Sequence, residues 1–313
     1  MVSAIPSTEP LSLEDVTKTY RRGAAAANRA ISLTFRAGEL IALIGHNGAG
    51  KTTLLNQIIG TTKPSSGDIR YGTASLVAKP DLARRVASMM PQMYAPLTGV
   101  TPLQAIASID RLRGLSGANA RREASTLIDQ LDIAQWQGTG GEKLSGGLRR
   151  LTSYAMAVIA PPPVLLIDEP TNDVDPVRRP LIWRHLRRLA DEGHIVVVVT
   201  HNLLEIQRTA DRYVLQNGNV LIDSTPRQLS QQARTTTLSV SVRSGAEITT
   251  TPPAARVHPI DQDGRLLLDL EPTHILDAVA WVLERVDAGE VDGYTLAPAS
   301  LESLYEGITD DER

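Results

Sequence analysis

A glycine-rich segment carries the strongest chemical signal in the chain. Residues 45–52 read GHNGAGKT, after an apolar run at 40–44 and before a helix-permitting run at 54–59. In this G-x-x-x-x-G-K-[ST] spacing, successive backbone N–H groups can close around phosphate oxygens at a helix start. Lys51 would reach the outer phosphates, and Thr52 would ligate a magnesium ion bridging them. The pattern predicts a site for a nucleoside triphosphate with Mg²⁺; the alternative is an ordinary glycine turn with an exposed lysine.

The residues expected to surround the phosphates are contiguous. They are Gly45, His46, Asn47, Gly48, Ala49, Gly50, Lys51, Thr52 and Thr53. The required context is a strand before them and a helix after them, and the flanking runs supply both.

Two acids follow a second apolar run. Residues 164–167 are Val-Leu-Leu-Ile, typical of a central parallel strand buried on both faces, and Asp168 and Glu169 come next. Open α/β sheets bind ligands beyond the carboxyl ends of their strands, so these acids are expected beside the phosphate loop. Asp168 would hold magnesium directly or through water, and Glu169 would face the attacking water. In isolation the pair would read as a helix cap and a solvated acid, but the nearby phosphate loop favours the catalytic interpretation.

Further candidates stand at the ends of predicted elements. Gln92 follows a predicted strand at 86–91, and His201 follows an apolar strand at 195–199. Ser145 can cap a helix that begins in Leu-Ser-Gly-Gly-Leu at 144–148 and runs to 159. Tyr20 ends a predicted strand at 11–20 and could stack on an adenine ring; a half-buried packing tyrosine is the alternative. A lone glutamine or histidine of this kind is usually structural. These residues are functional candidates only because they occur in order with the other motifs.

The pattern of the whole chain predicts an α/β fold in two parts. Residues 1–224 form a phosphate-loop core with an antiparallel β-subdomain and an α-helical subdomain at about 95–160. In that insert, Ala124, Leu127, Ile128 and Leu131 mark one helix face, and residues 114–117 separate two helices. Its arginines, Arg111, Arg113, Arg121 and Arg122, are expected on solvated faces; the alternative is contact with an acidic loop of a partner.

Residues 225–313 are expected to form a small α+β appendage. The pattern predicts strands at 235–242, 265–270 and 293–296, an amphipathic helix from about 275 to 286, and a last helix at 300–308. The two parts also differ in their balance of charged residues. Residues 1–223 carry 25 Lys+Arg against 20 Asp+Glu, and residues 224–313 carry 7 Lys+Arg against 15 Asp+Glu. Residues 1–10 are expected to be a loose leader.

The totals restrict the class of protein. A chain of 313 residues with 42% hydrophobic content supports one large and one small domain. It has no cysteine and no apolar run of membrane-spanning length, and its start lacks the features of a signal peptide. A net charge of −3 gives no indication of nucleic acid. We expect a soluble chain, so any role at a membrane needs a separate membrane-spanning partner.

The order of the motifs resembles the ATP-binding subunit of ABC transporters over about residues 10–223. The resemblance rests on Tyr20, GHNGAGKT at 45–52, Gln92, LSGGL at 144–148, VLLIDEP at 164–170, Asp175 and His201. It implies ATP and Mg²⁺ as cofactors, adenine stacking on Tyr20, magnesium contact and subunit coupling through Gln92, and a γ-phosphate contact from His201. It also implies that Ser145, Gly146 and Gly147 bind the ATP of a second copy, with Asp175 at the dimer seam.

Three positions depart from the family pattern. Leu148 stands where many members have Gln, although some exporters carry an apolar residue followed by basic residues such as Arg149 and Arg150. His46 stands inside the phosphate loop, and Asp173 adds an acid to the seam loop. None of these departures removes a group that the chemistry requires.

The resemblance implies an ATPase that drives membrane transport as a homodimer sandwiching two ATP molecules, peripheral on the cytoplasmic face through a separate membrane subunit. The tail from Ala297 resembles, weakly, that of exporters of drugs and antibiotics. The competing hypothesis is a soluble ABC-type ATPase that acts on ribosomes or DNA. A single ATP cassette and the lack of a basic stripe disfavour it.

Overall fold

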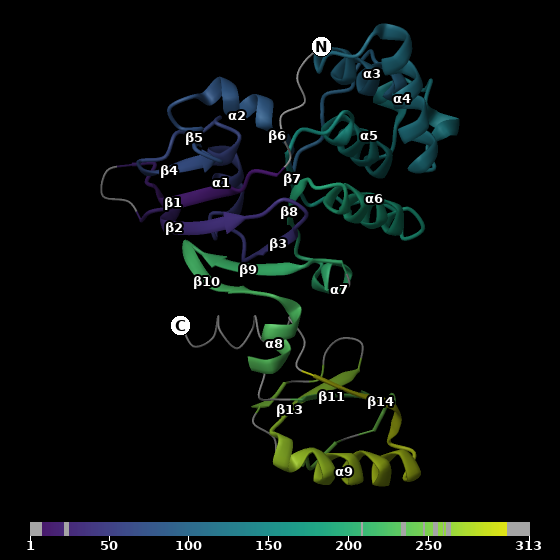
Figure 1. Cartoon of the computed structure of the whole chain (residues 1–313). Helices are drawn as coiled ribbons and strands as arrows, with labels where there is room; N and C mark the ends of the chain where they lie inside the picture. The colour runs from purple at the N-terminus through teal and green to yellow at the C-terminus, as the bar shows by residue number, and fades with distance from the viewer. Residues whose placement is uncertain are drawn as a thin grey trace. The chain divides into compact units, whose positions relative to one another are not determined.

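The chain consists of two compact units, Met1–Ser224 and Thr225–Arg313, and each has its own apolar core. The computed structural model describes residues 8–21, 25–207, 209–232, 236–246, 248–252, 256–258, 260 and 264–298 (Figure 1). The helix predicted at 300–308 and most of the expected leader lie outside the described residues.

A six-stranded sheet forms the centre of the first unit. Its strand order is β10-β9-β3-β8-β7-β6, parallel except for the β9–β10 hairpin. The strands are β3 (Leu40–Ile44), β6 (Ala87–Met90), β7 (Val164–Asp168), β8 (Ile195–Val199), β9 (Arg212–Asn217) and β10 (Asn219–Ser224). Every residue of β3, β7 and β8 is buried, which explains their unbroken apolar sequences. Because these three strands are adjacent and parallel, the segments that follow them meet at one edge of the sheet.

An antiparallel sheet lies beside this core (Figure 1), in the order β2-β1-β4-β5. Its strands are β1 (Leu11–Lys18), β2 (Asn28–Phe35), β4 (Ser66–Tyr71) and β5 (Ala74–Ser75). Alternate residues of β1 are buried in the same cluster as the apolar face of helix α1 (Lys51–Ile58). A register shift between Leu13 and Val16 marks a bulge at Asp15, whose φ is 49°. This sheet therefore supports the helix that begins at the end of the phosphate loop.

Three helices make up the α-helical part: α3 (Pro102–Leu112), α4 (Gly117–Gln130) and α5 (Gly146–Val158). Thr101 and Gln104 form a reciprocal capping box at the start of α3. The apolar face expected on α4 is buried, with Ala124, Leu127 and Ile128 inside. Helix α6 (Arg179–Asp191) packs on β8 and β3. The short helices α2 (Pro80–Val86) and α7 (Leu203–Ile206) have no counterpart in the sequence prediction.

Arg113 is a correction to the expectation of solvated arginines. Its guanidinium donates to the carbonyl of Ala157 at 3.2 Å, to the carbonyl of Ile159, and to the hydroxyl of Ser88 at 2.7 Å. The last carbonyls of a helix have no partner within the helix, and a cation placed there satisfies them. Arg113 therefore closes the C-terminal end of α5, and its burial lowers its pKa.

In the part of the second unit that the structure describes, a four-stranded antiparallel sheet packs with one long helix. Its order is β12-β13-β11-β14, with β11 (Thr236–Val242), β12 (Arg256–Val257), β13 (Arg265–Leu270) and β14 (Val291–Pro298). Helix α9 (Ile275–Asp287) buries Ala278 and Val282 against Leu238 and Val240 of β11. Helix α8 (Pro226–Gln232) precedes the first of these strands.

Candidate nucleotide site

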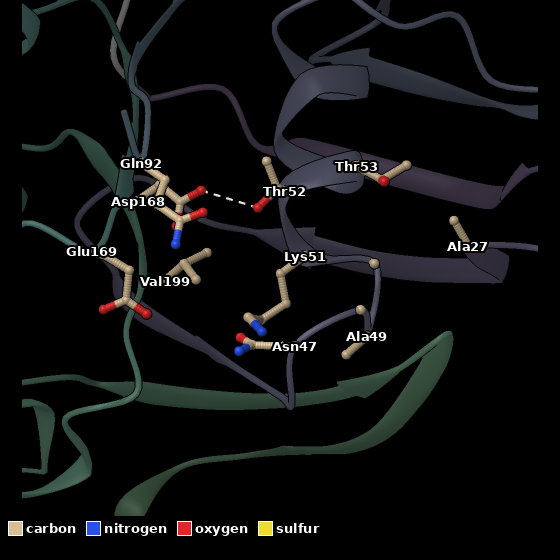
Figure 2. Close-up of a pocket in the computed structure, with 12 residues that line it drawn as sticks. Ala27, Asn47, Ala49, Lys51, Thr52, Thr53, Gln92, Asp168, Glu169 and Val199 are labelled. Atoms are coloured by element: carbon tan, nitrogen blue, oxygen red, sulfur yellow. Dashed lines mark hydrogen bonds between the residues drawn. The ribbon is translucent and has the colours of Figure 1, made fainter. Parts of the chain in front are cut away.

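A cavity of about 400 Å³ opens at the carboxyl ends of β3 and β7 (Figure 2). The lining residues come from the phosphate loop, the start of α1, the residue before β2, the segment after β6, the end of β7 with the residue after it, and the end of β8. They are Ala27, Asn47, Gly48, Ala49, Gly50, Lys51, Thr52, Thr53, Gln92, Asp168, Glu169 and Val199. Residues that are more than a hundred positions apart in the chain thus face one space.

The loop before α1 depends on glycine at two positions. Gly48 has φ +90° and Gly50 has φ +91°, the left-handed region that glycine enters without penalty. A Cβ added at Gly50 would also lie 2.1 Å from the carbonyl oxygen of Ala27 and 2.2 Å from the side chain of Asn28. Gly50 therefore serves both the turn and its close approach to β2.

Lys51 folds back over the loop. Its Nζ donates to the backbone carbonyls of Gly45 at 2.6 Å and His46 at 2.9 Å. Burial lowers the pKa of Lys51, while the nearby Glu169 and Asp168 act in the opposite direction. The ammonium group is therefore held at the loop, where its charge can meet a phosphate.

Thr52 and Asp168 meet in the cavity. The Thr52 hydroxyl donates to Oδ2 of Asp168 at 3.1 Å, as Figure 2 shows. Burial raises the pKa of Asp168, and the hydrogen bond from Thr52 lowers it by less. The hydroxyl, the carboxylate and the nearby Gln92 amide are hard oxygen donors, the type that Mg²⁺ prefers when phosphate completes its shell. Within the described part of the chain, no cluster of three His, Cys, Asp or Glu residues could hold a metal alone.

Glu169 is held in an unusual backbone conformation next to His201. Its φ is 52°, sparsely populated for residues other than glycine, and its N–H donates to the carbonyl of Val199 at 2.8 Å. Oε1 lies 2.9 Å from Nδ1 of His201, whereas the buried Oε2 has no hydrogen-bond partner among the described residues. Such strain is typical of functional sites. The unpartnered oxygen can accept a hydrogen bond from a water molecule.

Gln92 and Tyr20 differ in their placement. Gln92 lines the cavity, and its backbone carbonyl accepts a hydrogen bond of 2.7 Å from Arg150. Tyr20 lies outside the lining but is 63% exposed, and its hydroxyl is 3.2 Å from that of Thr53. Its ring is therefore not half-buried by packing, although the Lys18 ammonium lies 5.2 Å from the ring centre.

The remaining predicted residues do not line the cavity of their own chain. Ser145 caps α5 by accepting from the N–H of Leu148 at 3.3 Å. Gly146 and Gly147 form the first turn of that helix, and Asp175 pairs with Arg178 at 2.8 Å, which lowers the pKa of Asp175. These residues would need a second molecule to reach a nucleotide.

Polar residues that were not predicted from the sequence support the phosphate loop. The buried amide of Asn28 contacts two other buried amides, that of Gln57 at 2.8 Å and that of Gln216 at 2.7 Å. His46 Nε2 lies 2.7 Å from Oδ1 of Asn217 in the β9–β10 turn. The available signal was an amide inside an otherwise apolar run, as at Gln57.

The sheet order and this cavity define a class, the phosphate-loop nucleotide-hydrolysing proteins. The family model described as ABC transporter matches residues 28–172. Nod factor export ATP-binding protein I of Ralstonia nicotianae is 32% identical over 226 residues, which cover 72% of this chain and 70% of that protein. The daunorubicin/doxorubicin resistance ATP-binding protein DrrA of Streptomyces peucetius is 28% identical over 299 residues, covering 89% and 86%.

Solved structures give the same result. The structure of an ATP-binding subunit of an ABC transporter superposes with a TM-score of 0.65 at 26% identity, covering 71% of this chain and 92% of that one. The ATP-binding cassette MJ0796, in a dimeric post-hydrolysis state bound to ADP and Pi, gives 0.63 at 26% identity, covering 69% and 99%. This chain belongs to the ATP-binding proteins of the ABC transporter family, and it is an ATPase. Among the described residues, no helix has the length and apolar character to cross a membrane.

Proposed function

We propose that this chain is the ATP-hydrolysing subunit of an exporter whose cargo is a drug, an antibiotic or another hydrophobic or peptide molecule. The observation that carries the proposal is the single cavity that holds Lys51, the Thr52–Asp168 pair and Glu169. The direction of transport rests on relatives named for Nod factor export and for doxorubicin resistance. A separate integral-membrane subunit would hold the chain at the cytoplasmic face of the membrane.

Each catalytic role follows from the position of the group. Lys51 and the backbone N–H groups of residues 45–52 would bind the phosphates, with Tyr20 against the adenine ring. Glu169 would accept a hydrogen bond from the attacking water through its unpartnered Oε2. His201, held by Oε1 of Glu169, would contact the γ-phosphate. The side chains thus divide into those that bind the substrate and those that orient water.

Magnesium has a fitting set of donors in Thr52, Asp168 and Gln92. When bound, it would neutralise charge on the phosphates as they separate. Burial raises the pKa of Asp168 despite the hydrogen bond from Thr52, which is consistent with a place for a cation, because a further positive charge beside the carboxylate would favour its ionised form.

The residues outside the cavity would act on a second copy. Ser145 caps a helix of 13 residues that begins with Gly146 and Gly147, and backbone N–H groups at a helix N-terminus bind phosphate. Asp175 lies on the loop after Glu169, at the expected seam. We infer a homodimer with two ATP molecules between the copies, so that neither site is complete in one chain.

Glu169→Gln tests this function. The amide keeps the size of the side chain but cannot accept a proton, so we expect ATP binding to persist while turnover falls by roughly 100-fold or more. The stalled protein should accumulate as an ATP-bound dimer, measured by analytical ultracentrifugation with ATP and Mg²⁺. Full turnover in this variant would remove Glu169 from its role.

Co-purification tests the cellular role. We expect tagged protein extracted in mild detergent to retain an integral-membrane chain, identified by mass spectrometry. Recovery of ribosomal material or DNA without any membrane chain would replace the exporter with a soluble ABC-type ATPase.

A further inference from the structure

Three segments that serve the nucleotide site meet at a cluster beside the cavity. Tyr94 lies two residues after Gln92, Asp173 lies four residues after Glu169, and Gly146 and Gly147 begin α5. The Tyr94 hydroxyl donates to the carboxylate of Asp173. We refer to Tyr94, Asp173, Gly146, Gly147 and Arg150 as the bridging cluster.

The two glycines of the bridging cluster lie close to Asp173 and Tyr94. A Cβ added at Gly147 would lie 2.4 Å from the backbone oxygen of Asp173. A Cβ added at Gly146 would lie 3.3 Å from the Tyr94 hydroxyl and 3.6 Å from Cβ of Asp173. The first turn of α5 thus rests directly on the loop after Glu169. Packing of this kind fixes the two segments relative to each other.

Arg150 anchors the cluster from inside. Its residue is 2% exposed, and its guanidinium donates to the carbonyls of Pro91 at 3.1 Å and Gln92 at 2.7 Å. It also lies 5.5 Å from the centre of the Tyr94 ring. Burial lowers the pKa of Arg150, while Tyr94, Asp168 and Asp173 oppose that shift. One buried cation therefore connects α5 to the backbone of the Gln92 segment.

Asp173 adopts a conformation that needs external support. Its φ is 61°. Aspartate tolerates this backbone conformation better than most residues, but it is still less favourable for aspartate than for glycine. The hydrogen bond from Tyr94 raises the pKa of Tyr94, so the hydroxyl stays protonated and able to donate. Since Asp173 stands two residues before Asp175, the bond also holds the loop expected at the dimer seam.

We propose that Tyr94 and Asp173 are positioning residues that fix the loop after Glu169 against the start of α5, and so preassemble the surface this chain presents to its partner's ATP. The inference rests on the proposed function, because it assumes that Ser145–Gly147 and Asp175 act on the second copy. Neither residue lines the cavity of its own chain. Loss of the bridge should therefore weaken dimerisation and leave nucleotide binding to the monomer unchanged.

The test compares variants in the Glu169→Gln background of the full chain. Tyr94→Phe removes the hydroxyl and keeps the ring over Arg150. Asp173→Gly removes the acceptor and keeps access to positive φ, whereas Asp173→Asn keeps an acceptor oxygen. Sedimentation with ATP and Mg²⁺ gives the dimerisation constant. Titration of a fluorescent ATP analogue at protein concentrations below that constant gives the affinity of the monomer.

We expect Tyr94→Phe and Asp173→Gly each to weaken dimerisation by roughly five- to tenfold, the range of a hydrogen bond to a charged group at a partly exposed site. The double variant Tyr94→Phe/Asp173→Gly should lose no more than either single variant, because both remove the same bond. Asp173→Asn should restore most of the dimerisation. The affinity of the monomer for the analogue should stay the same in every variant.

Tyr294→Phe is the matched control, since it removes a hydroxyl from a tyrosine that is 41% exposed in the second unit. It should dimerise like the Glu169→Gln parent. Three outcomes would overturn the inference but leave the proposed function standing: unchanged dimerisation in Tyr94→Phe, additive losses in the double variant, or an equal loss in Tyr294→Phe. A parent that stays monomeric with ATP and Mg²⁺ would overturn the proposed function, and the inference with it.

Discussion

Glu169 and Asp168 are adjacent acids that differ in their hydrogen bonding and in the effect of burial on their charge. One carboxylate oxygen of Glu169 contacts His201, and the other is buried without a hydrogen-bond partner among the described residues. Asp168 is 2% exposed, and its pKa is raised because burial disfavours its charged form. Glu169 has an unpartnered oxygen that can meet water, whereas the charges of Lys51 and Arg150 offset only part of the desolvation of Asp168.

The raised pKa of Asp168 has a consequence for stability. A carboxyl group with a higher pKa in the folded state than in the unfolded state stabilises the fold at low pH, and this contribution is lost as the pH rises through the folded-state pKa. At neutral pH the ionised Asp168 therefore opposes folding of the nucleotide-free protein.

We predict that Asp168→Asn separates stability from activity. Without nucleotide, its melting temperature should equal or exceed that of the unaltered protein, because the buried charge is gone and the amide oxygen can still accept from Thr52. Turnover should fall by roughly 100-fold or more, the loss typical of removing a group that stabilises the transition state. Thermal unfolding with and without Mg²⁺ and ATP, together with phosphate release, measures both effects. If the nucleotide-free variant melted several degrees lower than the unaltered protein, the burial of the charged Asp168 carboxylate would not destabilise the fold.

At the scale of elements, sequence and structure agree most closely where burial is complete. Strands β3, β7 and β8 could be predicted because both faces are covered, which leaves unbroken apolar runs. The residues around the phosphate loop, Lys51, Thr52 and Asp168, were predictable because each type performs one task at fixed spacing. The cavity contains all three.

Elements that depend on tertiary contacts were beyond sequence patterns. Helix α2 has seven residues, too few to show a helical period, and it buries only Ala83 and Val86. Arg113 looks like any surface arginine until the end of α5 is placed beside it. The Asn28–Gln57–Gln216 amides likewise come from three separate segments. Such contacts join residues far apart in the chain and leave no local periodicity.

Helices α5 and α6 are joined by a buried polar pair that responds to pH. The Tyr154 hydroxyl lies 2.8 Å from Nδ1 of His185, and the two rings meet edge to face. Burial lowers the pKa of His185 from 6.5 to about 4. Because the folded protein resists protonation of His185, this contribution to stability is complete above pH 6.5 and is lost as the pH falls toward 4.

We predict that His185→Gln reduces the acid sensitivity of the first unit. Between pH 7 and pH 5, protonation of His185 in the unfolded chain should account for about 2 kcal/mol of lost unfolding free energy. Glutamine can accept from Tyr154 but does not titrate, so the variant should lose correspondingly less over this interval. Urea unfolding at the two pH values measures the difference. An equal loss in both proteins would show that other groups set the acid limit.

At the scale of the molecule, the nucleotide chemistry belongs to one unit. Every described residue that lines the cavity lies within Met1–Ser224, as do Tyr20, Ser145, Asp175 and His201. The second unit has a separate core, in which β11 and β13 pack on α9. It also differs in charge, with 15 Asp+Glu against 7 Lys+Arg in residues 224–313. Two cores and two surfaces indicate two cooperative folding units.

We therefore predict that a chain ending at Ser224 binds ATP with an affinity within about twofold of the full chain, since every described residue that lines the cavity lies in the first unit. Equilibrium titration with a fluorescent ATP analogue measures the affinity of both proteins. The ATP-dependent rise in melting temperature provides the control, because it shows that the shortened chain is folded when it binds. If the shortened chain folds but binds at least tenfold more weakly, residues 225–313 contribute to the nucleotide site. If its affinity is unchanged while Glu169→Gln in the shortened chain no longer dimerises with ATP, the second unit acts in holding the two copies together.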